Sequence, residues 1–488
     1  MAINDSIALL PLDNRPVSYL LPKQIADFSG INLILPERKY LGDLKRGSDL
    51  AYIEQWLQET VRVYHGTPLA LVISLDNFIY GGLVQSRKHN FTLEELKNRC
   101  RGLLQQIPTG RYGFSSIMRI PNYNSNEEEK DYWKDYGEKL FKWSELTHKV
   151  GDKNIATVQD IPLIMEEWYQ SSKKIPSDIL ADYKGHRDKN LTVNLIWLES
   201  LHENLFEYLI FACDDSGKYG MNVVESEYIK KQIKNHNFAS KAKVLSGTDE
   251  IPLVLLTKAV LRKSKYKPTV SLLFNSVEGK NQIARYESNT INDSVTGQIE
   301  TLGLEVRDYK DSDITLFIHC ADSVQGDHIF ENKPDDTKNN VSNLINQLEN
   351  FDKPFIVLDL AYANGADPNL IEALFNSNVN LGKCYGYAAW NTCANSTGSA
   401  LSIGINRWIA EKENRFNETV FKKCLLTRFL DDYAYQSQVR YKKISEEEVN
   451  LKMKPFVEKF SKSFQINNLD IHFRLPWNRS FEIEVQIN

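Results

Sequence analysis

Two adjacent carboxylates at the end of an apolar segment are the residues of this sequence best suited to chemistry. The segment 207–225, EYLIFACDDSGKYGMNVVE, leads into Asp214 and Asp215 and continues through a glycine-containing loop to Glu225. A strand that is buried on both faces is continuously apolar, and α/β folds bind ligands at the carboxyl ends of such strands. Two neighbouring carboxyl groups resist ionising together, so one of them can remain protonated and act as an acid.

The same arrangement recurs at other apolar segments of the chain. Asp, Asn, Arg and Tyr beside glycines are the types used for fixed hydrogen bonding, whereas solvated loops carry mixed Lys, Glu and Ser. We therefore expect the ends of these segments to share one site. The residues concerned are Asp13, Asn14, Arg15, Asp76, Tyr80, Arg87, Arg119, Asp249 and Glu250.

The elements that must position these groups alternate between strand and helix. Helical periodicity is found at 49–64, 93–106 and 224–234, and alternation of this kind predicts a parallel sheet. We expect an N-terminal α/β domain over 1–262, either barrel-like or doubly wound, and favour the TIM-barrel-like form. The predicted strands lie near 6–11, 31–35, 69–75, 113–119, 207–213 and 242–245.

A charged, helical excursion is expected at about 124–205, over the site. Its charge run, which begins with NEEEK, is interpreted as a solvated helix face. Arg187 and Asn190, just before its last helix, are the exceptions to that interpretation.

The basic, proline-terminated linker RKSKYKP at 262–268 indicates a boundary. We expect a second, smaller α/β domain at 268–410, with strands in TVSLLFN, DITLFIHC and PFIVLDLAY, and a C-terminal helical and β segment at 411–488 that packs on the body. Trp477 in that last segment is interpreted as a core residue outside the site. In the second domain, amide, indole and backbone N–H groups before a helix suit a polyhydroxylated or anionic ligand, and they belong to Trp390, Asn391, Thr392 and Asn395.

Composition narrows the classes of partner. The chain has 488 residues, of which 42% are hydrophobic, so it can bury a large core and exceeds one ordinary domain. Its net charge of −5 and the lack of a basic stripe argue against nucleic acid. The six cysteines lack the spacing of metal ligands, and no apolar segment is long enough to span a bilayer. We expect a cytoplasmic protein with no cofactor, no membrane partner and a small-molecule carbohydrate substrate.

A set of motifs spread over the whole chain resembles a known family. The motifs are LPLDNRP, SLDNFIYGGLVQSR, FACDDSGKYGMNVVE, SGTDE, DLAYANGAD and YAAWNTCANSTG. In this order they are similar to the bacterial family catalogued as domain of unknown function 4127. The resemblance implies a grouping and no particular activity.

The residue types point to carbohydrate hydrolysis. Paired acids with arginines and amides, without a His-Cys cluster, a phosphate loop or a GxGxxG motif, suit a glycosidase. We expect a glycoside hydrolase-like enzyme for an amino or acidic sugar, with catalytic groups among Asp214, Asp215, Glu225, Asp249 and Glu250. The Asp-Asp pair also resembles N-acetylhexosaminidases that use the acetamido group of the substrate as nucleophile. The residues expected to bind substrate are Asp13, Asn14, Arg15, Asp76, Tyr80, Arg87, Arg119, Arg187, Asn222, Trp390, Asn391, Thr392 and Asn395, among which Arg15, Arg87 and Arg119 suit a carboxylate or phosphate.

Two other classes of function fit the same residues. Asp13, Asp76, Asp214, Asp215 and Glu225 could converge on Mg²⁺ or Mn²⁺ in a metal-dependent hydrolase or isomerase. A non-catalytic carbohydrate-binding protein is the third possibility, because two α/β domains with a cleft between them also describe binding proteins.

Overall fold

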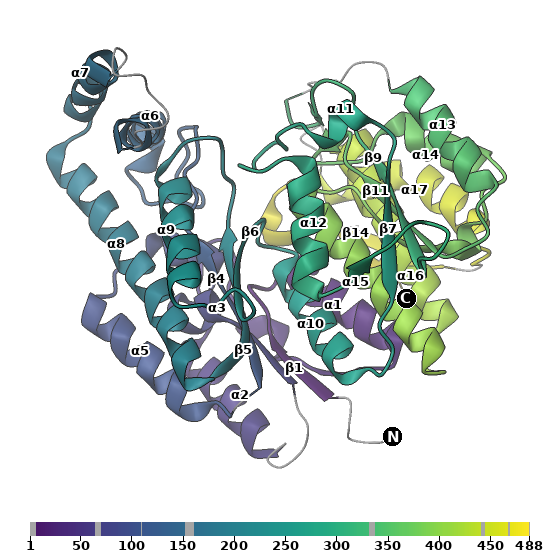
Figure 1. Cartoon of the computed structure of the whole chain (residues 1–488), viewed down its shortest axis with the longest axis horizontal. Coiled ribbons are helices and arrows are strands. Elements are labelled where there is room, and N and C mark those ends of the chain that lie inside the picture. The colour runs from purple at the N-terminus through teal and green to yellow at the C-terminus, as the bar shows by residue number, and fades with distance from the viewer. Residues whose placement is uncertain are drawn as a thin grey trace.

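The computed structural model describes residues 6–63, 70–108, 110–151, 161–330, 337–440, 445–466 and 469–487. Two parallel sheets stand side by side, each covered by helices (Figure 1). The first is six-stranded in the order β2-β1-β3-β4-β5-β6. Its strands are β1 (Ser6–Leu10), β2 (Asn32–Ile34), β3 (Ala70–Ser74), β4 (Arg111–Ile117), β5 (Phe206–Cys213) and β6 (Ala242–Ser246), close to the predicted positions.

This first sheet is open, with β2 and β6 at its edges, so the favoured barrel is not found among the described residues and the doubly wound alternative holds. The side chains of β1 show why the sheet is covered by helices on both faces. Ile7 and Leu9 belong to one apolar core, while Ala8 and Leu10 belong to another on the opposite face. A strand that is apolar on both faces needs helices on both, which an open wound sheet supplies. The strand order reverses between β1 and β3, the topological switch point where such sheets bind ligands.

The helices beside the first sheet divide between its two faces. Helices α1 and α10 pack on the face toward the second sheet, and α5, α8 and α9 cover the other. The helices between these strands include α1 (Pro16–Ser29), α2 (Leu50–Val63), α3 (Leu75–Tyr80), α4 (Leu83–Lys88), α5 (Leu93–Gln106) and α9 (Met221–Asn235), with a 3₁₀ turn, η2 (Arg38–Tyr40). Helix α10 (Ile251–Lys263) follows β6 and leads to the second sheet.

The long connection between β4 and β5 is helical over most of its described length, and residues 152–160 of it lie outside the description. It contains α6 (Trp133–Gly151), α7 (Ile161–Lys173), α8 (Ser177–Glu199) and η3 (Ser200–Glu203). Helices α6 and α7 lie at the upper left of Figure 1, beyond the carboxyl ends of the strands. The first part of the predicted helical excursion, residues 124–132, forms a loop instead.

The second sheet repeats the winding of the first. Its five strands are parallel in the order β13-β11-β9-β7-β8, which again reverses next to the first strand, between β7 and β9. The strands are β7 (Thr269–Phe274), β8 (Glu305–Val306), β9 (Ile314–His319), β11 (Phe355–Asp359) and β13 (Cys384–Ala388), and a small ladder pairs β10 (Gly326–Asp327) with β12 (Tyr362–Ala363). The accompanying helices are α11 (Val277–Lys280), α12 (Ile291–Leu302), α13 (Lys338–Glu349), α14 (Pro368–Asn376), η4 (Leu381–Lys383) and α15 (Cys393–Lys412).

The two sheets share one hydrophobic core. Helices α1 and α10 pack against α12 and α15 between the sheets, and buried residues such as Leu9, Phe114 and Phe355 belong to one continuous cluster. Burial of this kind holds the carboxyl ends of the first sheet in a fixed relation to the second. Among the described residues, no helix combines the length and apolar composition that crossing a bilayer requires.

The chain ends in a segment that returns to the first sheet. A π-helical stretch follows α16. Strands β14 and β15 form an antiparallel pair, and the loop between them reaches the carboxyl edge of the first sheet, where Trp477 contacts Asn14. Glu484, the first residue of β15, contacts Arg38. The elements are α16 (Glu418–Arg428), η5 (Phe429–Val439), α17 (Glu446–Ser463), β14 (Ile471–Arg474), η6 (Pro476–Asn478) and β15 (Glu484–Ile487).

Candidate active-site cleft

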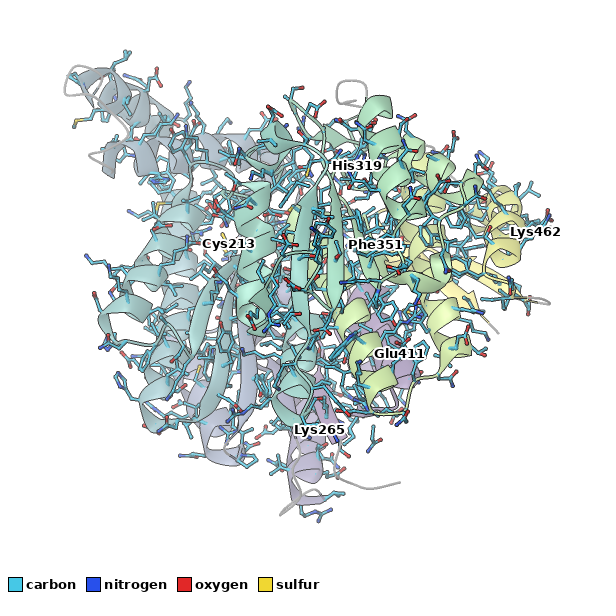
Figure 2. All side chains as sticks on the ribbon, turned by 45° about the vertical axis from the view of Figure 1, so that its right-hand side comes forward. Cys213, Lys265, His319, Phe351, Glu411 and Lys462 are labelled. Atoms are coloured by element: carbon cyan, nitrogen blue, oxygen red, sulfur yellow. The ribbon has the colours of Figure 1, made fainter. Side chains whose placement is uncertain are left out.

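A cleft of about 410 Å³ lies at the carboxyl edge of the first sheet. Loops of the first sheet form one wall, and the second sheet and the C-terminal segment form the other. Cys213, the last residue of β5, marks the approach to this edge in Figure 2. The lining includes Arg15, Arg87, Arg119, Asp214, Asp215 and Asp249 from the first wall and Tyr286, Asn364, Asn391, Arg440, Trp477 and Phe481 from the second.

Asp214 and Asp215 follow β5 directly and each is paired with an arginine. The Arg87 guanidinium donates to Asp214, and Arg119 Nη1 donates to Asp215 Oδ2 at 2.9 Å. Asp215 has φ of +31°, a region that Asp tolerates better than most residues. Burial, reinforced by the neighbouring Asp214, raises the pKa of Asp215 to about 6. The structure therefore provides a carboxyl group that is protonated in mildly acidic solution beside a second carboxyl group.

The loop that carries these acids is tied to both halves of the molecule. Ser216 N–H donates to the carbonyl oxygen of Tyr286 at 2.7 Å, and Asn222 Nδ2 donates to that of Asp215 at 3.3 Å. Asn222 was predicted to bind substrate, and it supports the Asp215 backbone.

Glu128 and Glu129 line the cleft, and the sequence analysis missed them as candidate site residues. Arg87 Nη1 lies 2.9 Å from Glu128 and 3.5 Å from Glu129, and Arg119 donates to the same pair at 2.7 and 3.0 Å. Arg479 also contacts Glu128. The interpretation of the charge run as a solvated helix face was wrong for these two carboxylates, which lie before α6 and form ion pairs with Arg87 and Arg119. They lie in the loop that follows β4 and Arg119, and the other candidate residues also lie in loops that follow strands. This position could have identified them from the sequence.

Arg15 links two of the predicted site loops. Its guanidinium donates to Asp13 at 2.8 Å and to both oxygens of Asp249 at 3.1 and 2.6 Å. Burial raises the pKa of Asp249 against the opposing effect of Arg15. These contacts fix Arg15 at the start of α1 in the wall of the cleft.

Trp477, which was predicted to be a core residue outside the site, lines the cleft. Its Nε1 donates to Asn14 Oδ1 at 2.6 Å. The guanidinium carbons of Arg15 and Arg479 lie 5.2 and 4.6 Å from its ring centroids. Such stacking orients the indole and both cations together. The contacts join residues far apart in the sequence, which sequence patterns cannot reveal.

Arg187 and Glu225 form a buried pair away from the described lining of the cleft. Arg187 donates to both carboxylate oxygens of Glu225 at 2.7 and 2.6 Å, and to the carbonyl oxygen of Met118 at 2.9 Å. Burial raises the pKa of Glu225 despite this partner. The pair joins α8, α9 and the end of β4, which is a structural role. Asn190 was also singled out, and its Nδ2 donates to the carbonyl oxygen of Ser86 at 2.8 Å.

Asp76 and Tyr80 lie beneath the cleft. Asp76 accepts hydrogen bonds from Ser116 N–H at 2.7 Å and from the Ser115 hydroxyl at 3.2 Å, and burial raises its pKa to about 6. Tyr80 stacks on His89 with ring centroids 4.7 Å apart. Both residues support the walls rather than line them.

Glu250 and the start of α15 form a second buried cluster. Gln298 Nε2 donates to Glu250 at 3.0 Å, and burial raises the pKa of this carboxyl group well above its usual value. A Cβ on Gly398 would meet Glu250 Cγ at 2.4 Å, so glycine is required for this close approach. Glu250 is thus a packed residue under the helix, and it does not line the cleft.

The Trp-Asn-Thr turn contributes one residue to the cleft. Asn391 lines it with φ of +73°. The Thr392 side chain caps α15 and accepts from Asn395 N–H, and Trp390 is buried with its ring 5.6 Å from that of Phe481. The predicted cradle is therefore mostly helix cap and core.

Metal binding requires several ligands around one point. No three His, Cys, Asp or Glu side chains gather in an arrangement suited to a metal ion in the described part of the chain. Asp13, Asp76 and Glu225, which were considered as joint ligands, each bind a different protein partner.

Comparison with known proteins places the chain in a family. No curated protein and no solved structure matches it. The model of the family described as protein of unknown function (DUF4127) matches residues 7–486, nearly the whole chain. The motif-based prediction is confirmed, and the chain belongs to this family.

Proposed function

We propose that this protein is a glycoside hydrolase that acts on an amino or acidic sugar in the cleft, with Asp215 as the general acid. The observation that carries the proposal is the Asp214-Asp215 pair. Asp215 lines the cleft, and its pKa is raised to about 6 by burial and by Asp214, which itself lies in an ion pair with Arg87. A cleft carboxyl group with a raised pKa beside a second carboxyl group is an arrangement typical of acid catalysis.

The two carboxyl groups have distinct tasks in this proposal. Asp215 gives its proton to the glycosidic oxygen as the bond to the anomeric carbon breaks, and positive charge develops on the sugar ring. The Asp214 carboxylate stabilises that charge or orients the acetamido group of an N-acetylated sugar. The carboxylate that remains on Asp215 then removes a proton from the attacking water.

The walls of the cleft suit a sugar. A volume of about 410 Å³ lies within the range of about 300–1,000 Å³ that is common for small-molecule sites. Trp477, Tyr123 and Phe481 offer apolar faces, and Asn364 and Asn391 lie on the lining with amide groups for hydroxyls.

The arginines favour acid-base chemistry over a carboxylate-bound metal. Asp214 and Asp215 each accept a hydrogen bond from a guanidinium, and Asp13, Asp76 and Glu225, the other acids proposed for Mg²⁺ or Mn²⁺, have other protein partners. A non-catalytic carbohydrate-binding protein would use the same walls, and it differs in forming no product.

The test is turnover of aryl glycosides, including N-acetylhexosaminides and uronides, with and without EDTA. We expect aryl alcohol release that survives EDTA and that is strongly reduced in Asp215→Asn for an aryl glycoside with a poor leaving group. The matched control is Asp27→Asn, because Asp27 is an exposed residue of α1 paired with Lys23. Turnover that EDTA abolishes would contradict the acid-base proposal in favour of the metal, and sugar binding with no product would favour the binding protein.

A further inference from the structure

Glu128 lies where three arginines from separate parts of the chain meet. Its Oε2 accepts from Arg87 Nη1 of α4 at 2.9 Å and from Arg119 Nη2, just after β4, at 2.7 Å. Its Oε1 contacts Arg479 of the C-terminal segment. The arginines hold the pKa of Glu128 well below its usual value, so it is ionised. One side chain therefore binds three guanidinium groups at the wall of the cleft.

The neighbouring Glu129 makes a useful contrast. Both acids line the cleft and bind Arg87 and Arg119, but the Glu129 side chain is 5% exposed and the Glu128 side chain is 18% exposed. Arg87 and Arg119 also keep Asp214 and Asp215 as partners. Burial raises the pKa of Glu129 against the opposing effect of the two arginines, and Glu128, as the more exposed of the two, is the carboxylate that can leave.

Arg479 depends most on Glu128. Among the described residues its other ion-pair partner is Glu482 at 3.7 Å, and burial raises the pKa of Glu482 to about 8, so this acid is neutral at neutral pH. The Arg479 guanidinium carbon lies 4.6 Å from the Trp477 ring centroid and 4.9 Å from that of Phe481, which fixes its plane. The buried Nε of Arg479 and that of Arg87 have no hydrogen-bond partner in the described part of the chain.

We infer that the position of the Glu128 carboxylate is a subsite for the carboxylate of an acidic sugar, and that Glu128 occupies it as a stand-in until the substrate displaces it. The inference rests on the proposed function and gives it a substrate class, a uronic acid. Planar guanidinium groups hold a carboxylate through paired N–H donors, and the present occupant has that chemistry. Arg119 binds both this position and Asp215, so the substrate carboxylate would sit beside the acid.

The experiment measures binding of glucuronate and of glucose by calorimetry at fixed ionic strength. In Glu128→Gln the stand-in charge is lost while the side-chain shape remains, so we expect glucuronate to bind at least about tenfold more tightly than to the wild type, with glucose unchanged. Arg479→Gln should weaken glucuronate binding by a similar factor and leave glucose unchanged.

Glu129→Gln is the matched control, since it removes the same charge one residue away. It should lower the melting temperature and give no selective gain for glucuronate. Glucuronate affinity in Glu128→Gln equal to or weaker than in the wild type, or an equal change for glucose, would overturn the subsite. If Glu128→Gln folds poorly, Glu128→Ala provides a second variant, for which we also expect tighter binding of glucuronate and unchanged binding of glucose.

The readout separates this inference from the proposed function. Hydrolysis by the wild type together with no selective gain in Glu128→Gln would reject the subsite and leave the glycosidase. A selective gain with no hydrolysis of any glycoside would keep the subsite and reject the glycosidase.

Discussion

The two parallel sheets have the same winding, but their carboxyl edges differ in how accessible the polar side chains are. The first sheet ends in a cleft of about 410 Å³ lined by arginine-carboxylate pairs. The second ends at His319 and Asp359, both with 0% exposure. Cys213 and His319 mark the ends of strands β5 and β9, one from each sheet, in Figure 2. A switch point supplies a crevice, and the side chains decide whether a ligand can enter it.

The second edge is filled by its own hydrogen bonds. His319 Nε2 donates to Asp367 at 2.8 Å, the Thr337 hydroxyl donates to the same carboxylate at 2.6 Å, and Asp367 N–H donates to Asp359 at 2.8 Å. Hydrogen bonds of this kind stabilise the fold, and they leave Asp359 Oδ1 as a buried atom without a partner in the described part of the chain. At the carboxyl edge of the first sheet, by contrast, arginine-carboxylate pairs line a cavity that is formed by loops from both halves of the molecule.

The largest expected effect concerns the acid of the open edge. Asp215→Asn should lower turnover of a glycoside with a poor leaving group on the order of 10³- to 10⁴-fold, because the departing oxygen then lacks a proton donor. A dinitrophenyl glycoside needs no such proton, and its bond cleavage should fall far less. Equal losses for both leaving groups, measured as kcat/KM, would show that Asp215 has another role.

Next in size is the buried pair that holds the helical excursion. Arg187→Met leaves the Glu225 carboxyl group buried without its partner and should lower the free energy of unfolding by about 3–5 kcal/mol. Arg187→Met combined with Glu225→Met should recover most of the loss, because no unpaired charge remains. Urea unfolding measures both values. A single variant as stable as the wild type would contradict the structural role.

A smaller loss is expected at the sealed edge. His319→Ala removes a buried partner of Asp367 and leaves a cavity, so it should lower the free energy of unfolding by about 2–4 kcal/mol. Turnover per folded molecule should stay within about twofold of the wild type, since this edge binds no substrate in our account. A loss of kcat without a loss of stability would show that the second edge also takes part in catalysis, which contradicts the account.

The smallest effect depends on pH. Burial raises the pKa of Glu482 to about 8, so between its unfolded value of 4.5 and about 8 the folded chain binds a proton that the unfolded chain lacks. Stability from this group is therefore lost as pH rises through that window. Glu482→Gln keeps the neutral form, and it should remove about 2 kcal/mol of the decline between pH 6 and pH 8. Thermal melts of both proteins at several pH values measure this pH dependence. The same decline in stability in both proteins would contradict the raised pKa of Glu482.

Much of the framework was predictable from the sequence. The strands of the first sheet were found because buried parallel strands are continuous apolar segments. Strand β13, CYGYA, was missed because its Cys, Gly and Tyr residues lack that signature. The paired acids and Arg15, Arg87 and Arg119 lie at the cleft as expected.

The missing part of the site depends on contacts over long sequence separations. Arg479 meets Glu128 across 351 residues, and Trp477 meets Asn14 across 463. Such contacts follow from the packing of the C-terminal segment against the first sheet, which no local pattern encodes. For the same reason Glu225 and Glu250 resembled catalytic acids in sequence and proved to be buried in the framework.

The pH dependence of kcat/KM for an aryl glycoside, measured in the wild type and in Asp215→Asn, tests the central claim most directly. The account predicts that the wild-type rate falls above pH 6 as Asp215 loses its proton, and that this alkaline limb is absent from the residual activity of the variant. The same limb in both proteins would contradict the assignment of Asp215 as the acid.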